Sequence, residues 1–124
     1  MAKANFEKVV FPKEAALIRD KVGEVFQVAD IAHWWCTRSR KRELVEARQV
    51  LMHLLRFYCR LGVTEVGLYC NRDHSTVCHA CDTVYQLRKQ PNLRKFNTNL
   101  TYLEEFAERN TGGAVLDQTH YPEH

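Results

Sequence analysis

Five consecutive polar side chains in the second half of the chain are the best suited to recognition chemistry. They offer a cation, a carboxylate, an imidazole and two hydroxyls, and they are Arg72, Asp73, His74, Ser75 and Thr76. Asp73 or Ser75 can cap a helix that follows, and its first turn would project these groups forward, as on a helix in the major groove of DNA. Such groups can form hydrogen bonds with base edges. The alternative interpretation is a polar helix start with no further role.

Positive charge is concentrated in one stretch, residues 36–60. The formal net charge of the chain is +3, yet this stretch holds seven basic residues against Glu43 and Glu46, so the rest of the chain is net negative. A local excess of this kind is the electrostatic footprint of a surface that binds a polyanion. A charged face that is simply solvated is the alternative.

Length and composition favour one small domain. With 124 residues, of which 45% are hydrophobic, the chain can bury a core but is too short for a second catalytic domain. Charged residues interrupt the apolar ones near the N-terminus, and no apolar run is long enough to span a bilayer, so we expect a cytoplasmic protein without membrane contact. Five cysteines, an odd number without a secretion signal, predict reduced thiols and no obligatory disulfide.

Hydrophobic periodicity predicts helices along almost the whole chain, and therefore an all-α fold. Apolar residues at helical spacing predict a first helix over about 12–26, with Pro12 in its first turn. A short second helix is expected after Asp30, with Trp34 and Trp35 on its apolar face.

A basic loop and a long helix should follow. Residues 37–42 have no apolar side chain to bury and should form a loop or a frayed turn. The helix over about 43–60 should carry one apolar stripe. Three polar side chains are predicted to lie off that stripe, on a face that can hold phosphates: Arg48, Gln49 and Arg56.

The residues after this helix predict a helix-turn-helix. Gly62 should end the preceding helix, as glycines often do just past a C-terminus. A short helix from Val63 to Tyr69 should be capped by Thr64 or by the residue before it. Asn71 tolerates left-handed backbone and should make the turn into the helix that Asp73 opens. A short helix, a tight turn and a longer helix are the helix-turn-helix plan.

The end of the chain completes a domain of about five to six helices. The helix after Asp73 should stop before Pro91, and a last helix is expected over about 92–108. We therefore expect an N-terminal tail over 1–11, a helix-turn-helix domain over 12–108 and a flexible C-terminal tail over 109–124.

Three short stretches carry a resemblance to a known family. Ala47-Arg48-Gln49, Glu65-Val66-Gly67, and Arg72 to Val77 with His79-Ala80 resemble the C-terminal DNA-binding domain, domain IV, of the bacterial replication initiator DnaA. The resemblance covers about residues 15–108. It implies a nucleoid-associated protein that binds double-stranded DNA at DnaA-box-like sites and acts in control of replication initiation or as a transcriptional regulator.

The resemblance also implies roles for individual residues. In the family, an arginine of the basic loop enters the minor groove and the first turn of the recognition helix reads bases in the major groove. These positions match Arg40, Asp73, His74, Ser75 and Thr76. Side chains that hold or flank the DNA backbone match Arg38, Lys41, Arg42, Arg48, Gln49, Arg56, Thr64 and Arg72; such contacts set register without reading sequence.

The chain departs from the family in two ways. The segment Gly67 to Asn71 is one residue shorter than the family's corresponding segment, which predicts a rebuilt turn and a slightly tilted recognition helix. No Gly-x-x-x-x-Gly-Lys-Ser/Thr loop is present, so the sequence offers no cradle for nucleotide phosphates and no cofactor is expected. The sequence therefore resembles the DNA-reading domain without the ATPase domain.

Other interpretations of the chain remain open at this stage. His74, Cys78 and Cys81 share one helix face, so a zinc site is conceivable, although small thiols on a core-facing helix are more simply buried hydrophobes. Trp34 and Trp35 offer a patch for a protein partner, and the chain would then be an adaptor that keeps the fold. Two tryptophans on a short helix more often supply one core anchor and one half-exposed ring.

An enzyme is not expected. The sequence contains no nucleophile with an associated base, no carboxylate pair and no cofactor loop. His53 has no partner that the sequence reveals.

Overall fold

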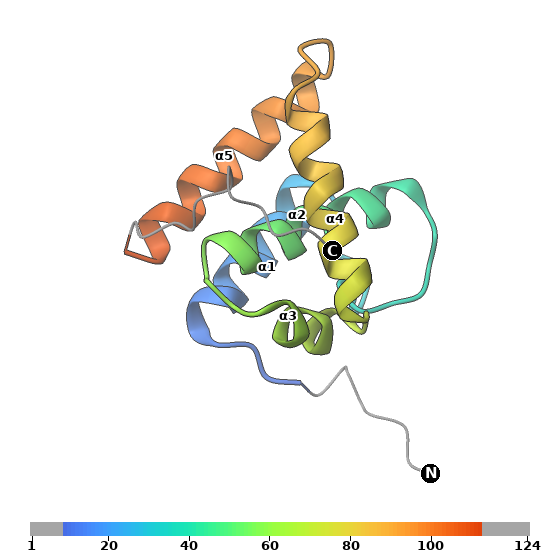
Figure 1. Cartoon of the computed structure of the whole chain (residues 1–124), viewed down its shortest axis with the longest axis vertical. Coiled ribbons are helices and arrows are strands. Elements are labelled where there is room, and N and C mark those ends of the chain that lie inside the picture. The colour runs from blue at the N-terminus through green and yellow to red at the C-terminus, as the bar shows by residue number, and fades with distance from the viewer. Residues whose placement is uncertain (1–8, 113–124) are drawn as a thin grey trace.

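The computed structural model describes residues 9–112, and this part of the chain is all-α, as predicted from the sequence (Figure 1). It contains no strand. Its helices are α1 (Lys13–Val25), α2 (Arg42–Phe57), α3 (Val63–Cys70), α4 (His74–Arg88) and α5 (Arg94–Asn110). Among them, no helix combines the length and the apolar character needed to cross a bilayer.

Helix α2 is the centre of the fold, because it packs against each of the other four helices. Its leucines at 44, 51, 54 and 55 are buried, as the predicted stripe requires. A helix surrounded in this way must bury more than one stripe. The prediction that Arg48 lies off the buried surface is therefore wrong: Arg48 is only 5% exposed, and His53 is only 1% exposed.

The segment between α1 and α2 differs from its prediction. Pro12 precedes α1 as the N-cap residue and is not in its first turn. No helix follows Asp30; residues 28–36 form successive turns, because Gln27 and His33 adopt positive φ angles of 60° and 56° that a helix excludes. Trp34 fills the space over Gly23, where an added Cβ would lie 2.8 Å from its Nε1.

The helix-turn-helix consists of α3, the turn 71–73 and α4. Asn71 is left-handed, with φ 56° and ψ 49°, as expected. Gly67 allows a close approach between helix and turn, because a Cβ there would lie 2.3 Å from the carbonyl oxygen of Arg72. These two residues let the chain turn from α3 into α4 within three residues.

Two predicted caps near α3 are wrong. Gly62 does not end α2; it is the N-cap residue of α3, and its N–H donates to Glu65 Oε1 over 3.3 Å. The chain leaves α2 through Arg60, whose φ of 61° supplies the left-handed residue instead. Thr64 lies inside the first turn of α3 and is exposed, so it is not the cap.

The ends of the domain extend slightly beyond the predicted limits. Phe11, assigned to the N-terminal tail, is 6% exposed and belongs to the core. Helix α4 ends at Arg88, before Pro91 as predicted, and α5 continues to Asn110, past the predicted boundary at 108. The rest of the predicted C-terminal tail, 113–124, lies outside the described residues.

A partly buried group of polar side chains joins α2, α4 and α5, and we call His53, Arg88 and Glu104 the Glu104 cluster. His53 Nε2 lies 2.8 Å from Glu104 Oε2, and Arg88 forms an ion pair with the same oxygen. Because an ionised carboxylate can only accept, Nε2 carries the proton. Nδ1 of His53 is then a buried acceptor with no hydrogen-bond partner among the described residues.

Candidate nucleic-acid interface

The first turn of α4 presents its polar side chains to solvent. Asp73 is the N-cap residue, and its carboxylate accepts a hydrogen bond from the backbone N–H of Thr76 over 2.8 Å. That hydrogen bond holds the pKa of Asp73 below its usual value. His74, Ser75 and Thr76 are exposed beside it. The cap therefore leaves a row of donors and acceptors facing outward, as the sequence predicted.

The basic loop, defined here as residues 37–41, lies next to the turn that starts α4. Its cations Arg38, Arg40 and Lys41 are exposed. Arg38 Nη2 is 3.5 Å from the side-chain oxygen of Asn71 in the turn. In Figure 1 this loop, in turquoise, descends from the start of α2 towards the start of α4. The structure thus brings together the two segments predicted to read DNA.

Three side chains hold the basic loop in this position, and we call Arg48, Asn71 and Arg72 the loop clamp. Arg48 donates to the hydroxyl of Thr37 over 3.1 Å and to the carbonyl of Ser39 over 2.5 Å. Arg72 donates to the carbonyl of Thr37 over 2.8 Å. Asn71 donates to the carbonyl of the residue before the loop, Cys36, over 3.2 Å. The clamp therefore comes from α2 and from the turn, and it holds the loop from two sides.

The clamp carries positive charge that no carboxylate neutralises. Burial, followed by the nearby Arg72 guanidinium, lowers the pKa of Arg48 to about 10, so Arg48 is still charged at neutral pH. Burial, followed by the charge of Arg38, also lowers the pKa of Arg72. Within residues 9–112 neither arginine forms an ion pair. The clamp thus adds to the positive potential beneath the loop.

Two predicted backbone contacts lie away from the loop. Arg56 is half-buried near the end of α2, and its Nη1 is 3.5 Å from the carbonyl of Leu61. Arg48 and Arg56 are eight residues apart, so they are separated by roughly 12 Å along the helix axis. Thr64 is exposed at the start of α3, close along the chain to Leu61. Arg56 and Thr64 therefore lie on either side of the connection between α2 and α3.

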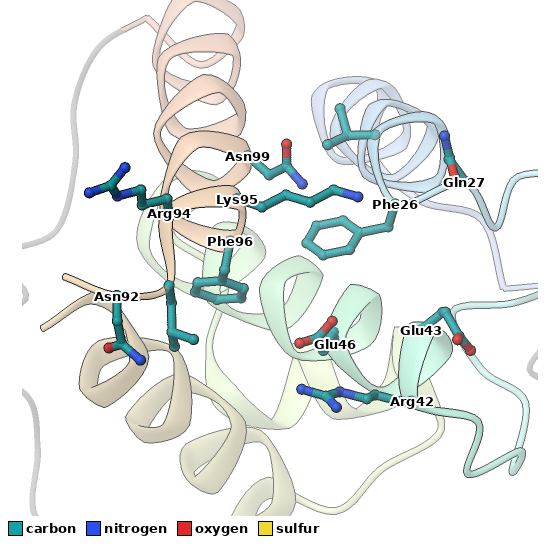
Figure 2. A pocket seen from close by; sticks show the side chains of 12 residues that line it. Phe26, Gln27, Arg42, Glu43, Glu46, Asn92, Arg94, Lys95, Phe96 and Asn99 are labelled. Atoms are coloured by element: carbon teal, nitrogen blue, oxygen red, sulfur yellow. The ribbon is translucent and has the colours of Figure 1, made fainter. Parts of the chain in front are cut away.

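Arg42 is part neither of the basic loop nor of the connection between α2 and α3. It is the first residue of α2, and its side chain lines a groove of about 480 Å³ between the end of α1, the start of α2 and the start of α5. Figure 2 shows Arg42 on the wall of this groove beside Glu46, with Lys95 and Phe26 across from them. Acidic side chains, Glu43 and Glu46, share that wall. Gln49, which is half-buried on α2, completes the predicted set.

Sequence reasoning missed the inward orientation of Arg48. A signal was present, because Leu44, Arg48, Leu51 and Leu55 follow a 4-3-4 spacing that places them on one helix face. The contributions of Thr37 and of the Asn71 side chain could not be inferred, since their partners lie 11 and 35 residues away along the chain.

The alternative sites are not assembled. Trp34 is 2% exposed and serves as a core anchor. Trp35 is half-buried, with its ring against Phe11 and beneath the guanidinium of Arg19 at 4.4 Å. The tryptophans therefore pack in the domain, which does not support a partner patch there. For the zinc alternative, residues 9–112 hold no three histidine, cysteine, aspartate or glutamate side chains placed to bind a metal ion.

Comparison with known proteins places these features in one family. The family model for the bacterial dnaA protein helix-turn-helix matches residues 15–84, which include the loop, the clamp and the first turn of α4. The chain is similar to the chromosomal replication initiator protein DnaA of Bacteroides thetaiotaomicron, with 49% identity over 49 residues (39% of this chain, 10% of the relative).

The same protein from two other bacteria matches longer parts of the chain. The Synechococcus relative is 39% identical over 82 residues, or 64% of this chain and 17% of the relative. The relative from Desulfotalea psychrophila is 36% identical over 72 residues, or 56% of this chain and 14% of the relative. The chain thus spans between a tenth and a sixth of the length of these curated relatives. Because the family model matches more than half of the chain, the chain belongs to the bacterial DnaA helix-turn-helix family.

Proposed function

We propose that this chain binds double-stranded DNA at specific sites that resemble the DnaA box, and that it acts in the control of replication initiation. The observation that carries the proposal is the hydrogen bond from Arg72 to the carbonyl of Thr37, which sets the basic loop beside the recognition turn. A helix-turn-helix commonly reads the major groove with its second helix while a neighbouring segment reaches the adjacent minor groove. Such a protein works in the cytoplasm, on the nucleoid.

The first turn of α4 reads bases in this proposal. The carboxylate of Asp73 can accept from the amino group of a cytosine, and the hydroxyls of Ser75 and Thr76 can serve base edges or contact a thymine methyl. His74 stands between them on the exposed surface. The basic loop follows the minor groove, with Arg40 entering where A·T pairs narrow it and deepen its negative potential.

Phosphates are bound on either side of the surface formed by the first turn of α4 and Arg40. Arg38 and Lys41 flank Arg40 in the basic loop, and Gln49 lies on the helix behind it. In this proposal Arg56 and Thr64 contact the DNA backbone near the start of α3, because the first helix of a helix-turn-helix crosses the backbone in this class of domain. These contacts set the register of the protein on the duplex without reading its sequence.

The test separates residues that recognise bases from residues that contact phosphates. Sites are first selected from random duplexes, and affinity is then measured on the best site and on random DNA. We expect His74→Ala to lose roughly 10- to 100-fold on the selected site and little on random DNA. Arg56→Ala should weaken both DNA types alike and reduce the salt slope, which we expect to be roughly −4 to −6 for the unaltered protein, by about one unit.

A matched control uses Arg109, an exposed cation in the last turn of α5. Arg109→Ala removes the same charge far along the chain from the proposed surface, so both affinities should stay within about twofold, as surface substitutions usually leave a fold intact. Equal losses for His74→Ala and Arg56→Ala on both DNA types would mean that α4 does not read bases. An affinity for duplex DNA that does not change with salt concentration would contradict the proposal of DNA binding.

Arg40→Ala examines the loop separately. Its loss should be largest on selected sites that carry A·T pairs at one end, and replacing those pairs with G·C should remove most of the difference between Arg40→Ala and the unaltered protein. Unchanged binding on the A·T-rich sites would place Arg40 outside the minor groove.

A further inference from the structure

The basic loop has almost no hydrogen bonds of its own. No backbone-to-backbone hydrogen bond joins residues 37–40 to any other part of the described chain. The carbonyls of Cys36, Thr37 and Ser39 instead accept from Asn71, Arg72 and Arg48. Apart from Lys41, whose carbonyl accepts from the backbone N–H of Val45, the loop is held by side chains and takes the position that they dictate.

The donors of the two clamp arginines are directed at the protein. Arg48 is 5% exposed, and its Nη1 and Nη2 both donate to the loop. Arg72 donates to the carbonyls of Cys70 and Asn71 with Nη1 and to that of Thr37 with Nη2. An arginine that grips a phosphate presents this same fork of N–H groups to the solvent. In both residues Nη1 and Nη2 already donate to the protein.

We infer that Arg48 and Arg72 are positioning residues for Arg40, and that they do not hold DNA phosphates. This inference rests on the proposed function and deepens it. The clamp ties the loop that enters the minor groove to the turn that starts α4, so that the two reading elements keep one fixed spacing. Minor-groove and major-groove recognition are then coupled through the protein.

Arginine suits this role better than an apolar residue of the same length. Its planar guanidinium offers several donors in fixed directions, so one side chain can hold both Thr37 and Ser39. A buried charge without a carboxylate partner is a poor device for stability, since well-packed hydrophobic residues are often as good or better. The same charge near the loop, however, favours an approaching phosphate chain.

A double-mutant cycle tests the inference. Arg48→Met removes the donors and keeps a long side chain, and Arg40→Ala removes the reader. Each should weaken binding to the selected site by about tenfold, while the double variant should be no more than about twofold weaker than the worse single variant, because both changes disable one contact. Adding Arg48→Met to the Arg40→Ala protein should change its salt slope by less than half of the roughly 0.9 that one phosphate contact contributes.

Direct phosphate contact by Arg48 predicts a different result. The two losses would then multiply, and Arg48→Met would reduce the salt slope by about 0.9 in both backgrounds, which would overturn the inference. Arg56→Ala is the matched comparison, since it should multiply with Arg40→Ala. Arg48→Lys, which keeps the charge but not the fork, should behave like Arg48→Met and not like the unaltered protein.

A second measurement needs no DNA and separates this inference from the proposed function. Trypsin cleaves after Arg38, Arg40 and Lys41, which lie in the loop. In folded Arg48→Met, these sites should be cut at least about tenfold faster than in the unaltered protein, because the loop opens locally. Cleavage after Lys89, between α4 and α5, should not change.

The outcomes of this measurement are distinct. Equal protection of the loop in both proteins contradicts the clamp, whether or not the chain binds DNA. If loop cleavage accelerates but no selected site is preferred over random duplex, the clamp stands and the proposed function fails. Should circular dichroism show that Arg48→Met is unfolded, Thr37→Val, which removes one acceptor and leaves Arg48 in place, replaces it in both experiments with smaller expected changes in the same directions.

Discussion

Helix α2 buries polar side chains in two regions, and the two are neutralised differently. In the Glu104 cluster, the charge of Arg88 is paired with Glu104 and the ring of His53 completes the network. In the loop clamp, the charges of Arg48 and Arg72 meet only carbonyls and a hydroxyl among the described residues. Arg48 and His53 are five residues apart, roughly 7.5 Å along the same helix.

The comparison shows that burial of a polar side chain does not by itself tell whether the residue serves stability or recognition. Both regions hide a polar residue of α2, yet only the Glu104 cluster has the charge balance of a group that serves the fold. The clamp leaves its positive charge uncompensated beside the exposed cations of the basic loop. We therefore expect changes in the Glu104 cluster to act on stability and changes in the clamp to act on DNA recognition.

The largest stability effect is expected for Glu104→Ala. It removes the partner of Arg88 and leaves the buried Nε2 of His53 without an acceptor, which should lower the free energy of unfolding by about 2 to 3 kcal/mol. Urea denaturation measures this, with Glu105→Ala, an exposed neighbour, as the control within about 0.5 kcal/mol. The folded variant should keep its preference for the selected DNA site, and a loss of that preference would erase the distinction between the two regions.

Gly67→Ala is expected to disturb the loop clamp from α3, because Gly67 packs against the backbone of Arg72. The new Cβ would meet the backbone carbonyl of Arg72 at 2.3 Å, and a backbone atom cannot rotate away. We expect a loss of about 2 kcal/mol in the free energy of unfolding, together with weaker discrimination between DNA sites. At Gly62 an added Cβ meets only the end of a flexible side chain at 3.7 Å, so Gly62→Ala should cost less. Equal costs would show that the turn can shift without penalty.

Acid should weaken the Glu104 cluster before the rest of the domain. Burial lowers the pKa of His53 below 6.5 despite the hydrogen bond to Glu104, so the unfolded chain takes up this proton more readily than the folded one. Stability from neutral His53 is therefore present above pH 6.5 and is lost as the pH falls below it, with a slope of up to about 1.4 kcal/mol per pH unit.

Glu104 adds to this loss at lower pH. Burial by itself raises the pKa of Glu104, but the hydrogen bond from His53 and the charge of Arg88 outweigh it, so the pKa lies below 4.5 and stability falls further under that pH. Urea denaturation at pH values between about 7.5 and about 5.5, on either side of the ordinary histidine pKa of about 6.5, isolates the contribution of His53 to the pH dependence of stability. His53→Gln should flatten the slope, whereas His79→Gln, at an exposed site on α4, should preserve it. A slope that survives His53→Gln would assign the effect to other groups.

The smallest effect on stability is expected for Thr37→Val. It deletes the hydroxyl that accepts from Arg48 but keeps the size of the side chain, so the free energy of unfolding should fall by about 1 kcal/mol or less. Discrimination between selected and random DNA should nevertheless decrease. If stability falls as much as in Glu104→Ala while DNA discrimination is kept, the clamp is a stabilising device like the Glu104 cluster.

The parts of the fold that follow local rules could be predicted from the sequence. Asp73 as a cap and Asn71 as the left-handed turn both depend on neighbours within a few residues. The candidate reading residues of α4 could be found from their types and position, whereas Arg40 depended on the family resemblance. The structure brings the basic loop next to the start of α4.

What could not be predicted depends on distant partners or on unusual backbone. The turns before Trp34 follow from positive φ angles at Gln27 and His33, two residue types with no strong turn signal. His53 seemed unpaired because Glu104 is 51 residues away. The hydrogen-bond partners of Arg48 could not be predicted either, because Thr37 and Ser39 lie 11 and 9 residues away along the chain.

The position of the two tryptophans makes the domain its own optical reporter. Trp34 and Trp35 are the only tryptophans of the chain, and they directly precede Cys36, whose carbonyl is tied to Asn71. Trp34 stands in a fixed apolar setting, while Trp35 lies under the guanidinium of Arg19, at 4.4 Å from its ring. Intrinsic fluorescence therefore follows the root of the basic loop without a dye or a substitution, and a shift in its emission on mixing with duplex would give the rate at which the loop settles.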